Sequence, residues 1–166
     1  MGVTNQKSDQ VTNATASPYT PNPAYYVGGK VRTLYFKHTQ SGAGDNTSDA
    51  LIAYIPAGQG VVLKTLCHWR WTAFGAGRTI DIGYGAHTKR DGTAVSAGLD
   101  VFADGVDVEN ADTNGAVMAV GTNADDNPFW VYDSKAPIPI YATSGGSGTW
   151  PDGAIIEGVL FYVSNE

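Results

Sequence analysis

The sequence predicts an all-β fold, an antiparallel β-sandwich of the jelly-roll type that follows an extended N-terminal arm. Three observations lead to this prediction. Gly, Pro, Asn and Asp interrupt short apolar runs about every dozen residues, as between the strands of a sandwich. No segment shows the sustained 3.6-residue apolar period of a long helix. Glycine accounts for 21 of the 166 residues, which suits a chain with many tight turns. A chain of this length fits one domain with a sizeable core.

Composition excludes several classes of function. The formal net charge is -6, and the ten Lys and Arg residues are scattered along the sequence, so we expect no nucleic-acid partner. No stretch approaches the roughly 20 apolar residues of a membrane span, and the N-terminus lacks the basic and apolar regions of a secretory signal. The one cysteine cannot form an intrachain disulfide, which favours assembly in a reducing compartment.

Residues 1–29 form the predicted arm, and residues 30–166 form the β-sandwich domain. The arm is rich in Thr, Asn, Ser and Pro and has no apolar periodicity, and its prolines favour an extended backbone. Tyr19, Tyr25 and Tyr26 lie near its end. Aromatic side chains bury much area and have few rotatable bonds, so we expect these tyrosines to anchor the arm on a neighbouring subunit. A passive tail is the alternative.

The domain begins with two predicted strands. The first, Lys30–His38, alternates Val31, Thr33 and Tyr35 with the side chains of the opposite face. A polar loop follows, and then Ala50–Ile55, which is apolar on both faces. Pro56-Ala57-Gly58 is a typical turn, with Pro at its second position and Gly at its fourth.

Residues 61–74 predict one long strand that contains the only cysteine. Every second residue is apolar or small, and these residues form the predicted core face: Val61, Leu63, Thr65, Cys67, Trp69, Trp71 and Ala73. Neighbouring side chains of a strand point to opposite faces, so Cys67 and His68 diverge and cannot form a nucleophile and its base. Cys67 is therefore predicted to be a buried, inert thiol.

Gly75 and Gly77 predict a tight reversal after this strand, and "TIDIGYG", residues 79–85, predicts a returning strand. Together the two strands predict a long hairpin.

Residues 86–114 are polar, and we expect them to be irregular. The spacing of Asn110, Asp112, Asn114 and Gly115 fits the start of a calcium loop, but Gly121 stands where the bidentate Glu is required. A solvated acidic loop is the stronger interpretation, so we expect neither a metal nor a cofactor. Two short strands are predicted after it, at residues 116–120 and 128–133.

Ala136–Ala142 predicts a strand at the rim of its sheet. Pro137 and Pro139 remove two N–H donors from the same side of that strand, and an unpaired edge tolerates this loss. The glycine-rich loop that follows lacks the Lys and Ser/Thr of a phosphate-binding loop. Trp150 lies in this loop. The closing strand, Ala154–Val163, is apolar on both faces and should be central.

Beyond these patterns, the chain resembles structural proteins of tailed-bacteriophage virions, especially the jelly-roll decoration (cement) proteins of the capsid. The resemblance spans about Gly28 to Val163. The segments behind it are "GGKVRTLYFKHTQSGAGD", "IPAGQGVVL", "FGAGRTIDIGYG", "DGTAVSA", "FADGVDV" and "WPDGAIIEGVLFYV". It implies a homotrimer on the capsid exterior that binds the major capsid protein and assembles in the host cytoplasm.

The leading hypothesis is therefore a non-enzymatic virion protein with no catalytic residues. Its predicted interface residues are Tyr19, Tyr25, Tyr26, Pro137, Pro139 and Trp150. A carbohydrate- or receptor-binding module is the alternative, with Trp150 as the best candidate to stack on a sugar ring and Trp130 undecided. Trp69 and Trp71 are expected in the core. An enzyme is disfavoured because no pair of catalytic groups is visible in the sequence.

Overall fold

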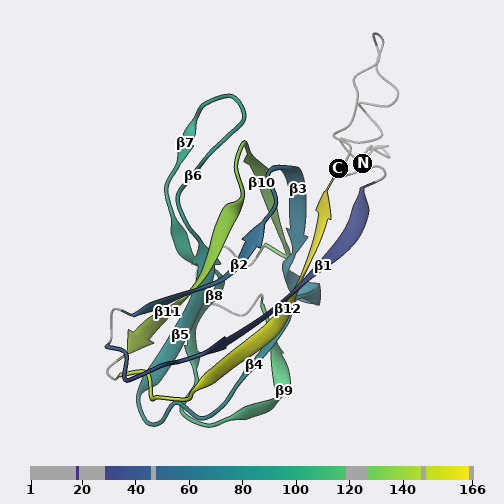
Figure 1. Cartoon of the computed structure of the whole chain (residues 1–166). Helices are drawn as coiled ribbons and strands as arrows, with labels where there is room; N and C mark the ends of the chain where they lie inside the picture. Colours follow the sequence, from purple (N-terminus) through teal and green to yellow (C-terminus); the bar gives the residue numbers. More distant parts are fainter. Residues whose placement is uncertain (1–17, 19–28, 46–47, 119–126, 147–148, 165–166) are drawn as a thin grey trace, which may run out of the picture.

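The computed structural model describes residues 18, 29–45, 48–118, 127–146 and 149–164. These residues form two antiparallel sheets packed as a sandwich, with one short 3-10 turn (Figure 1), so the predicted jelly-roll-like all-β fold is confirmed. In the described part of the chain no helix is long and apolar enough to cross a membrane.

The larger sheet has six strands. Five follow the order β10 (Phe129–Ser134), β3 (Gly58–Leu63), β12 (Ile155–Ser164), β4 (His68–Trp71) and β9 (Asp112–Val117), and β1 (Lys30–Thr39) pairs with β12. The smaller sheet has the order β2 (Asp49–Ile55), β11 (Ile138–Gly146), β5 (Arg78–Tyr84) and β8 (Gly98–Asp107). A short hairpin joins β6 (His87–Thr88) to β7 (Ala94–Val95).

β12 is central, as its two apolar faces predict. It pairs with β1 along its whole length, from Lys30 opposite Ser164 to Thr39 opposite Ile155. On its other side β12 pairs with β4 near its start and with β3 near its end. β3 and β4 thus lie end to end along the same edge of β12, and a short interruption separates them.

This interruption contradicts the prediction of one continuous strand over residues 61–74. The 3-10 turn Lys64–Leu66 separates β3 from β4. Before the turn the predicted faces are wrong, because Val62 and not Val61 belongs to the core; after it Cys67 and Trp69 lie in the core as predicted. Lys64 is 1% exposed, whereas Thr65 and Leu66 are exposed. The Lys64 ammonium donates a hydrogen bond to the Val101 carbonyl, with 2.9 Å between nitrogen and oxygen. In the sequence, apolar or small residues recur at every second position straight through the turn, so the alternation gives no sign that the strand is interrupted.

Cys67 lies at the interruption and is fully buried, as predicted. Its thiol replaces a missing backbone group of the ladder: the Phe161 N–H of β12 donates to Sγ over 3.1 Å, and Sγ donates to the Leu63 carbonyl over 3.3 Å. Burial raises the pKa of the thiol to about 11. His68 is exposed, so the two side chains diverge as expected.

The predicted hairpin between residues 61–74 and 79–85 is wrong, because β4 and β5 belong to different sheets. The connection crosses from one layer to the other through Gly75 and Gly77, whose φ angles of 92° and 68° disfavour other residues. The tight reversal predicted from Gly75 and Gly77 is therefore confirmed, although it does not form a hairpin. Its direction depends on long-range bonds such as that from the Phe74 N–H to the Val108 carbonyl, 2.9 Å.

The predicted rim position of residues 136–142 is also wrong. β11 lies inside the smaller sheet, between β2 and β5. Pro137 lies before the first residue of β11, so its missing N–H is outside the ladder. In an antiparallel strand the nitrogen and the carbonyl of one residue point to the same neighbouring strand, and for Pro139 that strand is β5. Pairing with β5 begins only at Ile140 opposite Tyr84, and the Pro139 carbonyl accepts from the Gly85 N–H, which lies just past β5. The missing donor thus falls where the ladder ends.

The polar segment 86–114 contains more regular structure than expected. It includes the whole of the β6–β7 hairpin and of β8, and the start of β9. Asp112, part of the calcium pattern, accepts bonds from the Asn114 and Gly115 N–H groups at 2.8 and 3.1 Å, which makes it a turn-forming residue. Among the described residues no three His, Cys, Asp or Glu side chains could together hold a metal ion.

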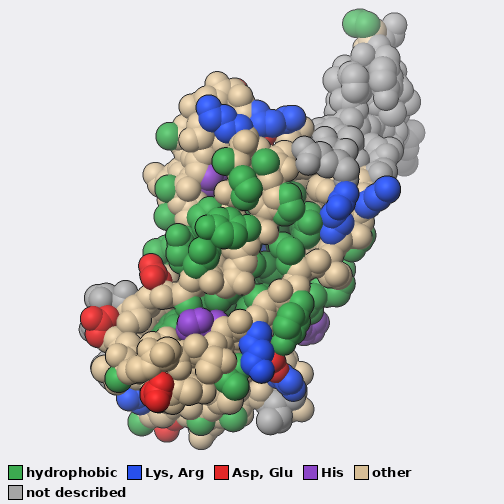
Figure 2. Space-filling model, viewed as in Figure 1, with side chains coloured by type: hydrophobic (Ala, Val, Ile, Leu, Met, Phe, Trp, Pro, Cys, Tyr) green, Lys and Arg blue, Asp and Glu red, His purple; other side chains and the backbone are tan. Residues whose placement is uncertain are grey.

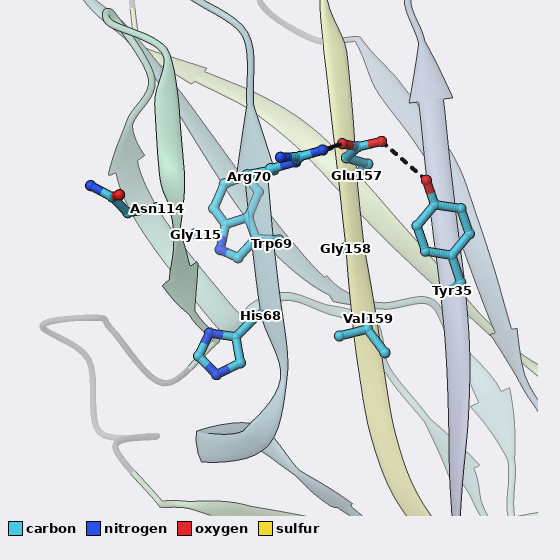
Figure 3. A pocket seen from close by; sticks show the side chains of 9 residues that line it. All are labelled: Tyr35, His68, Trp69, Arg70, Asn114, Gly115, Glu157, Gly158 and Val159. Atoms are coloured by element: carbon cyan, nitrogen blue, oxygen red, sulfur yellow. Dashed lines mark hydrogen bonds and ion pairs between the residues drawn. The ribbon is translucent and has the colours of Figure 1, made fainter.

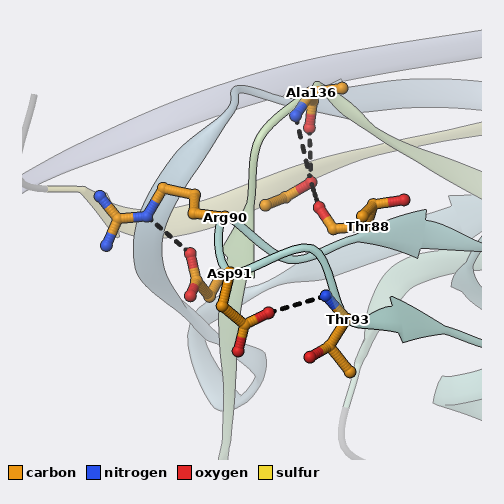
Figure 4. Close-up of polar contacts among 7 residues, drawn as sticks. Thr88, Arg90, Asp91, Thr93 and Ala136 are labelled. Atoms are coloured by element: carbon orange, nitrogen blue, oxygen red, sulfur yellow. Dashed lines mark hydrogen bonds and ion pairs between the residues drawn. The ribbon is translucent and has the colours of Figure 1, made fainter.

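Aromatic side chains fill the space between the sheets. Trp69 and Trp71 are buried with ring centroids 4.5 Å apart, as predicted for core residues. Trp130 is half-buried and stacks on Tyr84 of the other sheet at 4.5 Å. The β6–β7 hairpin is tied to β10 and the segment after it (Figure 4), for example by the ion pair between Arg90 and Asp133 at 2.8 Å.

Candidate functional site: the outer face of the larger sheet

The face of the larger sheet that points away from the sandwich core has two unlike halves. Alternation on β1 and β12 puts Phe36 and Leu160 into the core, and it puts Tyr35 and Glu157 on the outer face. Near the start of β12 this face is polar. Near the end of β12 it is apolar.

The polar half is organised by one carboxylate that links three strands (Figure 3). Glu157 of β12 accepts a hydrogen bond from the Tyr35 hydroxyl of β1 over 3.0 Å and one from Arg70 Nε of β4 over 2.6 Å. The hydrogen bond from Arg70 holds the pKa of Glu157 below its usual value, and the bond to Glu157 raises the pKa of Tyr35. These contacts orient all three side chains.

A shallow groove of about 370 Å³ lies beside this group, lined also by His68, Asn114 and Val159. A smaller hollow of about 240 Å³ lies next to it, and Arg70 and Glu157 line both. The groove offers an exposed phenol ring, an imidazole and an amide to a ligand. The only cysteine, Cys67, is buried between β3 and β4, so no thiol nucleophile reaches this surface.

The apolar half is crossed by four valines from four adjacent strands. Cross-strand pairing aligns Val131 of β10 with Val61 of β3, Val61 with Val163 of β12, and Val163 with Val31 of β1. We call these four residues the valine row. Its ends are open, with Val31 60% and Val131 48% exposed, whereas Val61 and Val163 between them are only 7% and 8% exposed. Phe129, 50% exposed and opposite Leu63 of β3, extends the apolar surface beside the row.

Charged groups border this apolar half without entering the valine row. The Arg90–Asp133 ion pair lies at one side, because Asp133 follows Val131 by one alternation on β10. Arg70 and Glu157 lie at the other end of the sheet. Figure 2 shows Lys and Arg side chains near the β6–β7 hairpin and near the start of β1, with hydrophobic side chains between these groups. Clustered apolar surface with a polar rim is typical of a protein-binding face.

The structure describes three of the six interface residues predicted from the sequence. Tyr19, Tyr25 and Tyr26 lie outside the described residues. Pro139 is half-buried in β11, opposite the exposed Tyr54 of β2.

Trp150 lies in a loop, as predicted, but its side chain is buried and is not available to a ligand. Its side chain is 1% exposed and packs edge-on against Phe74, with ring centroids 5.7 Å apart, so it cannot stack on a sugar. The Gly44 N–H also donates to the Trp150 carbonyl over 3.0 Å. This backbone hydrogen bond from a segment distant in the sequence fixes the position of the loop, with the Trp150 side chain turned into the core.

Sequence reasoning missed the valine row. Each valine sits in an ordinary alternating strand, and their alignment depends on the pairing of β10, β3, β12 and β1. The apolar residues on both faces of β12 were the one available signal, because a strand whose outer face is solvated does not need them.

The chain is similar to a chain of the cyanophage Pam1 capsid asymmetric unit, with a TM-score of 0.55 and 13% sequence identity over 99% of both chains. It is also similar to a chain of the infectious bursal disease virus Gx strain, with a TM-score of 0.45 and 16% identity over 82% of this chain and 32% of that one. No protein-family model matches the sequence, and no curated protein matches it. At 13% identity the first similarity shows a shared fold.

Proposed function

We propose that the chain is a non-enzymatic structural protein of a phage virion that decorates and stabilises the capsid from outside. In this role it binds the major capsid protein and other copies of itself, as a homotrimer. The full-length similarity to a chain of a phage capsid is the observation that supports the proposal most directly. Because 99% of each chain is covered, that chain is about as long as this one, and the similarity in fold extends over almost all of both chains.

The surface of the domain supports a binding role. The apolar half of the outer face presents aliphatic and aromatic side chains without a charge in the valine row. Such a face gains free energy when another protein removes it from water. In the described part of the chain Cys67 is buried and His68 points to the opposite side, so the sequence motif that could suggest a nucleophile supplies none.

Analysis of purified particles of the virus that encodes the chain tests the proposal. We expect mass spectrometry to find the protein in a fixed ratio to the major capsid protein, and cryo-electron microscopy to place its sandwich on the outer surface in groups of three. Absence from purified particles would refute the virion role. Presence inside the shell or only in the tail would refute decoration.

A carbohydrate- or receptor-binding role is the second candidate, and the polar groove favours it. Tyr35 is 69% exposed and lies beside Glu157 and Arg70, so a ring for stacking stands next to charged hydrogen-bonding groups. A glycan array distinguishes the two roles. Binding by the wild-type chain that Tyr35→Ala abolishes would favour this second function, and Leu99→Ala, which changes an exposed side chain of the other sheet, is the matched control.

A further inference from the structure

The valine row leaves an apolar side chain exposed at each of its two ends. Four adjacent strands about 4.8 Å apart make the row about 14 Å long. Its outer valines, Val31 and Val131, are 60% and 48% exposed, whereas Val61 and Val163 are only 7% and 8% exposed, so an occupant must reach both ends of the row. Apolar side chains that line up across a flat sheet face suit a segment lying across the strands.

The chain contains a segment with matching chemistry. From Gln10 to Gly29 there is no charged side chain, and residues 18–27 include Tyr19, Tyr25, Tyr26 and three prolines. An uncharged segment gives up no charge hydration when it covers valines. Its prolines reduce the conformational entropy lost on docking. Nine residues, 19–27, reach about 30 Å when extended, which exceeds the length of the row.

The start of β1 indicates where this segment leaves the sheet of its own copy. Lys30 begins β1 and pairs with Ser164, the last residue of β12, so the chain enters the sheet at its very end. A segment that continued the direction of β1 beyond Lys30 would leave the sheet of its own copy. Gly28 and Gly29 precede Lys30 and allow the segment to turn toward a neighbour.

We infer that residues 19–27 of one copy dock across the valine row of a second copy. The inference rests on the proposed function, in which copies bind one another, and it names the surface and the segment that they use. The tyrosines cover the valines and Phe129, while the prolines keep the segment extended.

Cross-linking of the full-length protein tests this contact. Tyr26 is replaced by the photoreactive benzoylphenylalanine, and equal amounts of unlabelled and ¹⁵N-labelled protein are mixed, unfolded, refolded together and irradiated. We expect cross-links from position 26 to peptides of β10, β3 or β12, in products that contain one light and one heavy chain.

Two variants of the receiving surface make the test specific. Val131→Glu places a charge in the valine row and should lower the yield of mixed cross-links at least tenfold. Leu51→Glu is the matched control, because Leu51 is also a strand residue and is 45% exposed against 48% for Val131. It lies in the other sheet and should leave the yield unchanged. Circular dichroism and melting of each variant confirm that it is folded.

Cross-links only within single chains, cross-links to the smaller sheet, or no cross-link to the valine row would overturn the inference. Equal losses of cross-linking in both glutamate variants would also overturn it. The proposed function is judged separately, by finding the protein on purified particles. A protein that decorates the capsid without these cross-links keeps the proposed function and loses only this contact.

Discussion

Replacement of Cys67 by alanine removes the group that fills the gap between β3 and β4. The Phe161 N–H then has no acceptor in a buried site, which costs about 1–3 kcal/mol. The lost burial of the sulfur adds about 1 kcal/mol. We expect Cys67→Ala to lower the free energy of unfolding by about 2–4 kcal/mol. Cys67→Ser keeps an acceptor and should lose less.

Urea unfolding followed by tryptophan fluorescence measures these differences, because Trp69 and Trp71 are buried close to the site in sequence. Thr65→Ala is the control, since Thr65 is exposed in the adjacent 3-10 turn. It should change the stability by less than about 0.5 kcal/mol. If Cys67→Ala is as stable as this control, the thiol does not complete the ladder.

The pH dependence checks the same site independently. The folded thiol has a pKa of about 11 against a usual 9.0, a difference worth roughly 3 kcal/mol. A raised pKa means that this stability is fully present below pH 9 and is lost as the pH rises from 9 to 11. The stability gap between wild type and Cys67→Ala should therefore narrow over that range. At pH 8 thiol reagents should label the folded protein slowly and the urea-unfolded protein fast. Rapid labelling of the folded protein would contradict the burial.

Three other substitutions test the packing of β12 and the burial of Trp150. Gly158→Ala puts a Cβ 2.5 Å from the His68 carbonyl oxygen, and urea unfolding should show a loss of about 2–3 kcal/mol; an unchanged midpoint would mean that the sheet yields easily. Glu157→Gln should destabilise the protein at pH 7, and the deficit should vanish in acid, because the bond from Arg70 lowers the pKa of Glu157 and its stabilisation is lost as the pH falls through that pKa. A deficit that persists in acid melts would argue against this ion pair. Trp150→Ala should cost about 3–5 kcal/mol in thermal or urea unfolding, and a neutral result would mean that the ring is not in the core.

The sequence by itself determined the features that depend on neighbouring residues. Period-two alternation predicted most strands and the opposite directions of Cys67 and His68. Glycine and proline predicted where the chain turns, since both act through local backbone geometry. The apolar residues on both faces of β12 predicted its central place.

Only the tertiary structure decided the features that depend on distant residues. The strand that contains Pro139 can lie inside its sheet because β5 pairs with it only from Ile140 onward. The burial of Trp150 depends on its packing against Phe74 and on the backbone bond from Gly44. The valine row exists only because four strands align in one register. Local periodicity sets the faces of each strand, but hydrogen bonding between segments far apart in the chain chooses its neighbours, and the functional surface is made of those neighbours.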